Sequence, residues 1–127
     1  MQFYLEHNLA HVSIEIVYRG AVLDVPRVIL DTGSATTLLS VDYVEQVGII
    51  PEASDRIHNI YGLGGVESVF MRNLDSLKVG GATIDRFSID VGGMDYVRDI
   101  NGILGMDFLL RAGAMINLRK MTLEFDA

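Results

Sequence analysis

The sequence predicts a single, mainly-β domain, a sandwich or barrel-like sheet with one or two short helices. Three observations support this fold class. Apolar residues recur with period two along several short segments, and glycine-rich turns separate these segments. The chain of 127 residues is long enough for one compact core and too short for two. Many short strands with few helices are typical of sandwiches and barrels, so residues 1–127 are expected to form one domain.

The first expected elements form a β-hairpin near the amino terminus. Residues 11–18 alternate polar and β-branched side chains, as a half-buried strand does. Residues 19–21 mark a turn, and residues 22–30 return as the second strand. Pro26 lies within this second strand and cannot donate a ladder hydrogen bond, so it predicts an edge position or a bend.

A short helix and a second hairpin are expected next. Ser40 is the expected cap of the helix, and Gly48 is its expected stop. Strands at residues 57–61 and 66–71 flank a glycine-rich tip, which predicts a hairpin. Further strands, separated by turn signals at 80–81, 92–93 and 119–120, are expected at residues 74–79, 83–91, 115–118 and 121–125.

The sequence contains one internal echo. Residues 20–24 and 81–85 share the pattern Gly-Ala-x-aliphatic-Asp, and each lies at an expected hairpin turn. A strand and then a glycine-containing break follow each of them, at residues 31–33 in the first half and 103–105 in the second. Either two turns converged on the same chemistry, or the domain is built from two similar hairpin-plus-helix halves.

The composition argues against several functions. A formal net charge of -7 disfavours binding to nucleic acid, whose backbone phosphates attract clustered Lys and Arg. The absence of cysteine rules out disulfides and thiolate metal sites, and the three histidines lack a metal-ligand spacing, so no metal and no cofactor are expected. No apolar run suits a transmembrane helix, and the amino terminus does not resemble a signal peptide. A cytoplasmic or otherwise soluble protein is therefore expected.

Asp31 is the candidate catalytic residue. It directly follows an apolar strand and opens a turn that contains Thr32, Gly33 and Ser34. The glycine allows backbone N–H groups to approach the carboxylate, and the two hydroxyl groups can donate hydrogen bonds that orient it. Taken alone, the same four residues are also typical of an ordinary turn at the end of a strand.

Three segments together resemble the aspartic proteases of the retropepsin-like and pepsin-like type. In order, they are Asp31-Thr32-Gly33-Ser34, the hairpin tip Tyr61-Gly62-Leu63-Gly64-Gly65, and Ile103-Leu104-Gly105 with Phe108 and Leu109 after it. That family has a catalytic loop, then a flap, then an aliphatic strand that ends in Gly and enters a short helix. The resemblance covers residues 12–125 and implies a closed, β-barrel-like acid-protease lobe.

The sequence also departs from the retroviral members. Ala35 and Thr36 stand where those enzymes usually carry two acidic residues, and Met106 stands where they carry Arg. Both partners of an ion pair common in retroviral members are therefore missing. Retroviral substrate contacts and interface details are not carried over to this chain, whereas the catalytic carboxylate is unaffected.

The resemblance implies catalysis by two carboxylates that share a proton across a water molecule. The chain contains one Asp-Thr-Gly and no Asp-Ser-Gly, so it supplies half of such a site. A twofold homodimer would bring Asp31 of each subunit together at the axis. By the same resemblance, Thr32 would lock the two loops together across the interface, and Gly33 and Ser34 would hydrogen-bond the aspartate.

The remaining expectations concern the substrate and the edges of the domain. The hairpin at residues 57–71 is expected to close as a flap over an extended peptide. The terminal strands, residues 2–6 and 122–125, are expected to pair across the dimer, as in viral relatives. Asp107 is expected to be a helix cap or a surface residue. The leading function is an aspartic endopeptidase; the alternative is a non-catalytic peptide-binding or dimerisation module with the same fold.

Overall fold

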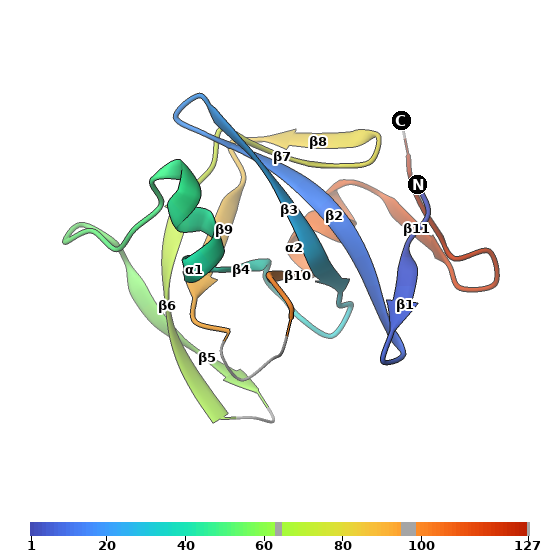
Figure 1. Cartoon of the computed structure of the whole chain (residues 1–127), viewed down its shortest axis with the longest axis horizontal. Helices are drawn as coiled ribbons and strands as arrows, with labels where there is room; N and C mark the ends of the chain where they lie inside the picture. Colours follow the sequence, from blue (N-terminus) through green and yellow to red (C-terminus); the bar gives the residue numbers. More distant parts are fainter. Residues whose placement is uncertain (63–64, 95–98, 127) are drawn as a thin grey trace.

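The computed structural model describes residues 1–62, 65–94 and 99–126, and for residues 61–62 and 65–67 it describes the backbone only. The described residues are mainly β, with a ten-stranded sheet, a separate two-stranded hairpin and short helices (Figure 1). The strands are β1 (Tyr4–Glu6), β2 (Leu9–Tyr18), β3 (Ala21–Leu30), β4 (Leu38–Ser40), β5 (Ile57–Gly62), β6 (Gly65–Asn73), β7 (Ser76–Val79), β8 (Ala82–Asp85), β9 (Ser88–Gly92), β10 (Gly102–Leu104), β11 (Ala114–Asn117) and β12 (Thr122–Phe125). The helices are α1 (Val41–Val44), the 3-10 turn η1 (Glu45–Val47) and α2 (Met106–Arg111).

The large sheet is open, so the expected closed barrel is wrong. Its strand order is β5-β6-β9-β4-β10-β3-β2-β7-β8, with β1 paired to β2. Within the described residues, β5 and β8 form the two ends of this path, and no hydrogen-bonded ladder joins them. The sheet instead curls over its own core, and side-chain packing takes the place of a closing ladder (Figure 1).

The centre of the sheet is symmetric in its topology. β4 and β10 are antiparallel neighbours, and each has a parallel strand from the other half of the chain on its outer side, β9 beside β4 and β3 beside β10. This arrangement agrees with two similar halves. It also corrects the expected correspondence between them, because residues 102–104 occupy the place of residues 38–40. The topological counterpart of the Asp31 loop is the connection between β9 and β10.

Two strands differ from the sequence-based expectation. The expected strand 83–91 is broken at Arg86, whose φ of 54° turns the chain and separates β8 from β9. Pro26 lies in a strand that pairs on both sides, so it does not mark an edge. It marks a bend, because Arg27 has a φ of 62° and the register between β2 and β3 shifts opposite this point, between Val12 and Ile14.

The helix after β4 is where the sequence placed it. Ser40 precedes α1, and η1 ends at Gly48, whose φ of 85° is readily adopted by glycine. Val44 is buried on the inner side of this segment and belongs to the main core. Ser40 occupies the N-cap position, but its side chain makes no capping hydrogen bond. The sequence therefore predicted where this short helical segment begins and ends, but not a capping hydrogen bond from Ser40.

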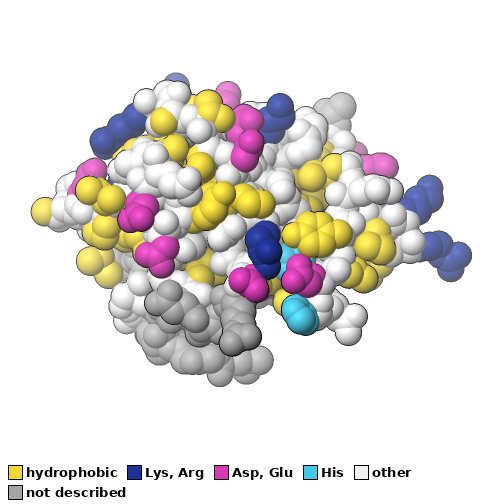
Figure 2. Space-filling view, in the orientation of Figure 1, with side chains coloured by type: hydrophobic (Ala, Val, Ile, Leu, Met, Phe, Trp, Pro, Cys, Tyr) yellow, Lys and Arg dark blue, Asp and Glu magenta, His cyan; other side chains and the backbone are white. Residues whose placement is uncertain are grey.

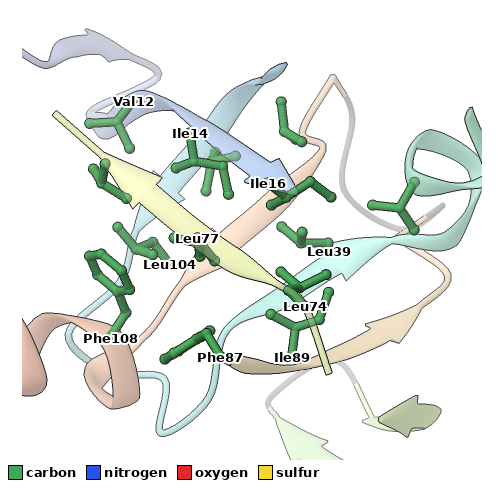
Figure 3. Packing of buried hydrophobic residues seen from close by; sticks show 14 of the residues in the cluster. Val12, Ile14, Ile16, Leu39, Leu74, Leu77, Phe87, Ile89, Leu104 and Phe108 are labelled. Carbon is green, nitrogen blue, oxygen red and sulfur yellow. The ribbon is translucent and has the colours of Figure 1, made fainter. Parts of the chain in front are cut away.

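The core is divided between the two faces of the sheet. Figure 3 shows the main cluster, in which β2, β4, β7, β9, β10 and α2 contribute aliphatic and aromatic side chains. Burial of each large apolar side chain stabilises the fold by about 1.5–3 kcal/mol, so this cluster supplies most of the stability. A smaller cluster consists of Ile29, Leu38, Val69, Met94 and Ile100, with Ile60 and Ile103 packed against it.

The smaller cluster lies on the opposite face of the sheet from the main core. Val28, Leu39 and Leu104 belong to the main cluster, whereas their neighbours Ile29, Leu38 and Ile103 belong to the smaller one. Side chains alternate between faces along a strand, so Asp31, two residues after Ile29, continues on the face of the smaller cluster. We call this side of the sheet the Asp31 face.

The chain termini are tied together within the molecule. The Met1 amino group donates to Leu123 O at 2.8 Å, the Phe3 N–H donates to Met121 O at 3.0 Å, and β11 pairs with the other side of β12. β12 is thus flanked on both sides by its own chain, so it does not offer the edge that the sequence suggested for pairing across a dimer. Figure 1 shows both ends of the chain beside this hairpin.

The surface in Figure 2 has no single dominant charge, since Lys and Arg side chains are separated by acidic and apolar ones on the face shown. Among the helices of the described residues, none is long and apolar enough to cross a membrane.

Candidate active site

The sheet fixes the position of Asp31. β3 and β10 run parallel, with Leu30 opposite Leu104 at the end of the ladder. The Asp31 N–H then donates to Leu104 O at 3.0 Å, which continues the pairing by one residue. The candidate catalytic residue is therefore held by a strand of the second half of the chain, and its side chain is half-buried at the end of β3.

The turn after Asp31 orients its carboxylate through the backbone. The Gly33 N–H donates to Asp31 Oδ1 at 2.8 Å, and the Ser34 N–H donates to the Asp31 carbonyl at 3.1 Å. A Cβ atom at Gly33 would lie 3.1 Å from Oδ1, so a larger residue would crowd the carboxylate. The Ser34 hydroxyl group donates to Thr36 O at 2.7 Å, which corrects the expectation that it bonds to the carboxylate. Thr32 is exposed.

The Ile103-Leu104-Gly105 segment passes directly against this turn. The Met106 N–H donates to Ser34 O at 2.8 Å, and the Asp107 N–H donates to Ala35 O at 3.2 Å. A Cβ atom at Gly105 would overlap the Thr36 carbonyl group and come within 2.9 Å of Ser34 O. Because these obstacles are backbone atoms, glycine is required here, and the sequence-predicted supporting segment does contact the catalytic turn.

Asp107 ties the catalytic turn to α2, a role that the sequence did not reveal. The Thr37 N–H donates to Asp107 Oδ2 at 3.0 Å, and the Thr37 hydroxyl group donates to Oδ1 at 2.7 Å. Thr37 Oγ1 in turn accepts the Gly105 N–H at 3.1 Å. Asp107 is the second residue of α2, whose cap is Gly105, so the expected cap role is wrong, and its carboxylate instead binds Thr37. Thr37 and Asp107 are 70 residues apart, and neither belongs to a spaced motif that could have paired them.

The segment expected to act as a flap forms a hairpin. β5 and β6 pair from Ile57 with Phe70 to Gly62 with Gly65. Leu63 and Gly64 lie outside the described residues, and the structure gives only the backbone of Tyr61, Gly62 and Gly65. Within the hairpin, Ile60 of β5 and Val69 of β6 pack into the cluster on the Asp31 face. The hairpin is therefore anchored on the side of the sheet that carries the candidate catalytic residue.

The described residues contain no group of three or more His, Cys, Asp or Glu side chains that could hold a metal ion. The chemistry offered by the site is that of a carboxylate with one oxygen bonded to a backbone N–H. A single carboxylate of this kind can accept or donate one proton, and it needs a second acidic group nearby to act as a dyad.

The comparison with protein families agrees with this geometry. A family model described as aspartyl protease matches residues 14–108, which is most of the chain and includes the Asp31 turn, the hairpin and the Gly105 segment. The chain therefore belongs to the retropepsin-like aspartyl protease family. A comparison with curated proteins found no match. Family membership indicates protease activity of the aspartic type.

Proposed function

We propose that the protein is an aspartic endopeptidase whose active site is completed by Asp31 of a second, identical subunit. One observation carries this proposal: the Gly33 N–H holds the Asp31 carboxylate, and β10 holds the Asp31 backbone at the end of β3, so the carboxylate is fixed as a reactive group must be. The chain contains a single Asp-Thr-Gly, so a symmetric pair requires two copies. Thr32 is exposed and is available for contact with the partner's loop.

In the proposed reaction, the two carboxylates share one proton and hold a water molecule between them. Two like charges in contact cannot both ionise at low cost, so one aspartate stays protonated. The ionised Asp31 takes a proton from water as the oxygen attacks the scissile carbonyl carbon, and the protonated partner donates a hydrogen bond to the carbonyl oxygen. The partner's proton moves to that oxygen, which gives a neutral tetrahedral diol. As the C–N bond breaks, the carboxyl group that took the proton from water passes it to the leaving nitrogen, and the partner carboxylate recovers a proton from a diol hydroxyl group.

The β5–β6 hairpin is the proposed cover for an extended peptide substrate. β5 is an end strand of the sheet, so the hairpin can open without breaking any ladder except its own attachment to β9. Closure over the substrate would exclude water and place the peptide bond against the dyad.

The first test is cleavage of a peptide library by wild type and by Asp31→Asn between pH 4 and 7. Loss of general acid–base catalysis predicts a fall of at least about a hundredfold in kcat/KM. Asp24→Asn is the matched control, because Asp24 is an exposed aspartate on β3, the strand that ends just before Asp31. Equal cleavage by wild type and Asp31→Asn contradicts the assignment.

Subunit mixing tests the shared site. Wild-type protein is mixed with inactive Asp31→Asn protein, and the subunits are allowed to exchange between dimers. If each dimer needs two intact aspartates, the activity per total protein falls with the square of the wild-type fraction. A linear decrease contradicts a shared dyad. Peptide binding without cleavage by the wild-type protein would instead support the alternative, a non-catalytic peptide-binding module.

A further inference from the structure

Asp90 is a buried carboxylate on the Asp31 face, outside the catalytic turn. In the ladders of the sheet, Ile29 lies opposite Ile103, Ile103 opposite Leu38, and Leu38 opposite Asp90. Directly paired residues point to the same side, so these four side chains form one row across four strands. Asp90 is the polar member of an otherwise aliphatic row, and its residue exposure is 3%.

The Asp90 carboxylate is only half partnered. His58 Nε2 lies 3.3 Å from Oδ1, and the His58 side chain is 39% exposed on β5. Oδ2 is buried and has no hydrogen-bond donor among the described residues. A buried carboxylate oxygen without a donor is costly, and native proteins seldom keep one without a reason. A carboxylate only accepts hydrogen bonds, so the missing group must be a donor.

We propose that Asp90, with His58 beside it, forms a specificity subsite for a Lys or Arg side chain of the substrate. This proposal rests on the proposed peptidase function. The aliphatic side chains of Leu38 and Val69 would contact the stem of the substrate side chain, and its cationic head would donate to Asp90 Oδ2. The formal net charge of -7 also favours the approach of basic peptides over acidic ones.

The position of Asp90 suits a substrate residue close to the scissile bond. β9 is three strands away from β3, a separation of about 14 Å at the usual strand spacing. An extended peptide rises about 3.3 Å per residue, and a lysine side chain reaches about 6 Å, so the subsite is within reach two or three residues from the scissile bond. His58 and Ile60 both lie on β5, the end strand of the sheet, so opening of the hairpin would uncover Asp90 and closure would bury the bound cation.

The experiment measures binding, so that it does not depend on cleavage. Peptides that differ only by Lys or norleucine at the second or third position on either side of the scissile bond are titrated into the Asp31→Asn protein by fluorescence anisotropy. At one position the lysine peptide is expected to bind about tenfold more tightly. Adding Asp90→Asn or Asp90→Leu removes this preference, while adding Asp85→Asn, an exposed carboxylate on the distant β8, keeps it. Two Asp90 variants are used because either one alone could fold poorly.

Equal binding of lysine and norleucine peptides at every position overturns the subsite, as does a lysine preference that survives both Asp90 substitutions. The two proposals fail separately. A wild-type protein that cleaves no peptide, although Asp31→Asn prefers lysine through Asp90, contradicts the peptidase and supports the subsite. Cleavage that requires Asp31 but shows no lysine preference contradicts the subsite alone.

Discussion

Two buried carboxylates near strand β6 contrast sharply in how they are partnered. Asp55 lies before β5 with a side chain that is 7% exposed, and Arg72 Nη2 donates to its two oxygens at 2.8 and 2.7 Å. The Glu52 N–H donates to Oδ2 as well, at 2.6 Å. Asp90, on the opposite side of the sheet, has a histidine near one oxygen and no donor to the other within the described residues.

The two carboxylates also differ in the face of the sheet on which they are bound and in how complete the surrounding hydrogen-bond network is. Arg72 pairs with Ile89 in the ladder and therefore points to the main-core side, where it also donates to Tyr18 Oη at 3.0 Å and to Ile50 O at 2.8 Å. Asp90 is the next residue after Ile89 and points to the Asp31 face. The complete Arg72–Asp55 network ties a loop to the sheet and leaves neither Asp55 oxygen free to bind a ligand. Asp90, in contrast, keeps one carboxylate oxygen that can still accept a hydrogen bond.

The largest predicted effect on stability follows from breaking the complete network. Arg72→Met leaves the carboxylate of Asp55 without its cation and removes the donors to Tyr18 and Ile50. We expect the Tm to fall by about 5–10 °C, measured by circular dichroism at pH 7. Arg86→Met, at an exposed arginine, is the control and should leave the Tm nearly unchanged. A Tm of Arg72→Met within a degree of wild type would mean that this network does not stabilise the fold.

Thr37→Val tests a third carboxylate, that of Asp107, which is well partnered and lies beside the Asp31 turn. The substitution removes the hydroxyl group that donates to Asp107 and accepts from Gly105, while it keeps the side-chain shape. A small displacement of the Asp31 turn is expected to lower kcat about tenfold or more with little change in KM. The Tm should fall by about 3–6 °C.

Two variants define how the Thr37 result is interpreted. Thr37→Ser retains the hydroxyl group and should restore kcat, whereas Thr83→Val, on β8, should leave it unchanged. If Thr37→Val lowers the Tm but keeps full kcat, Asp107 stabilises the fold without positioning the catalytic turn.

The complete network also predicts a dependence of stability on pH. Burial raises the pKa of Asp55, but hydrogen bonds from Arg72 and Glu52 and the charge of Arg72 outweigh it and hold the pKa below its ordinary value of 3.8. The folded state therefore binds this proton less readily than the unfolded state does. The resulting stability is fully present above about pH 4 and is lost as pH falls through the lower, folded-state pKa.

Asp55→Asn measures this contribution. The difference in Tm between wild type and Asp55→Asn should be a few degrees at pH 6 and should shrink steadily below pH 4, because a protonated aspartate resembles asparagine. A difference that stays constant down to pH 2.5 would show that the Asp55 carboxylate is not stabilised as an anion.

The contrast between the sites also explains what sequence alone could predict. Alternation over residues 11–18 identified β2, the turn at residues 19–21 identified β3 as the returning strand, and cap and stop residues located α1, because local patterns encode these elements. β4 and β10 are only three residues long and too short to show a period. Arg86 broke an expected strand through a left-handed backbone conformation that its residue type does not favour.

The candidate site was predictable only as far as its motif. Asp31 and Gly33 were found because they belong to one three-residue motif, and Gly105 because the resemblance supplied it. The contacts of Thr37 with Asp107 and of His58 with Asp90 arise from sheet register and join segments that are distant in sequence. Whether the sheet closes into a barrel depends on whether its two end strands pair with each other, and no residue pattern in the sequence predicts this.

The smallest predicted effect on stability concerns Asp90, and it separates a ligand site from a structural one. Asp90→Leu removes an under-partnered buried carboxylate from a row that already contains Ile29, Ile103 and Leu38. Replacing such a group by an apolar residue of similar volume is often neutral or stabilising, so we expect the Tm to stay the same or rise by about 1–3 °C. A fall comparable to that of Arg72→Met would show that Asp90 is held by the fold in the way that Asp55 is. Stability that is unchanged or higher, together with a loss of lysine preference, is the combination expected of a residue retained for binding, because natural proteins often sacrifice stability at such positions.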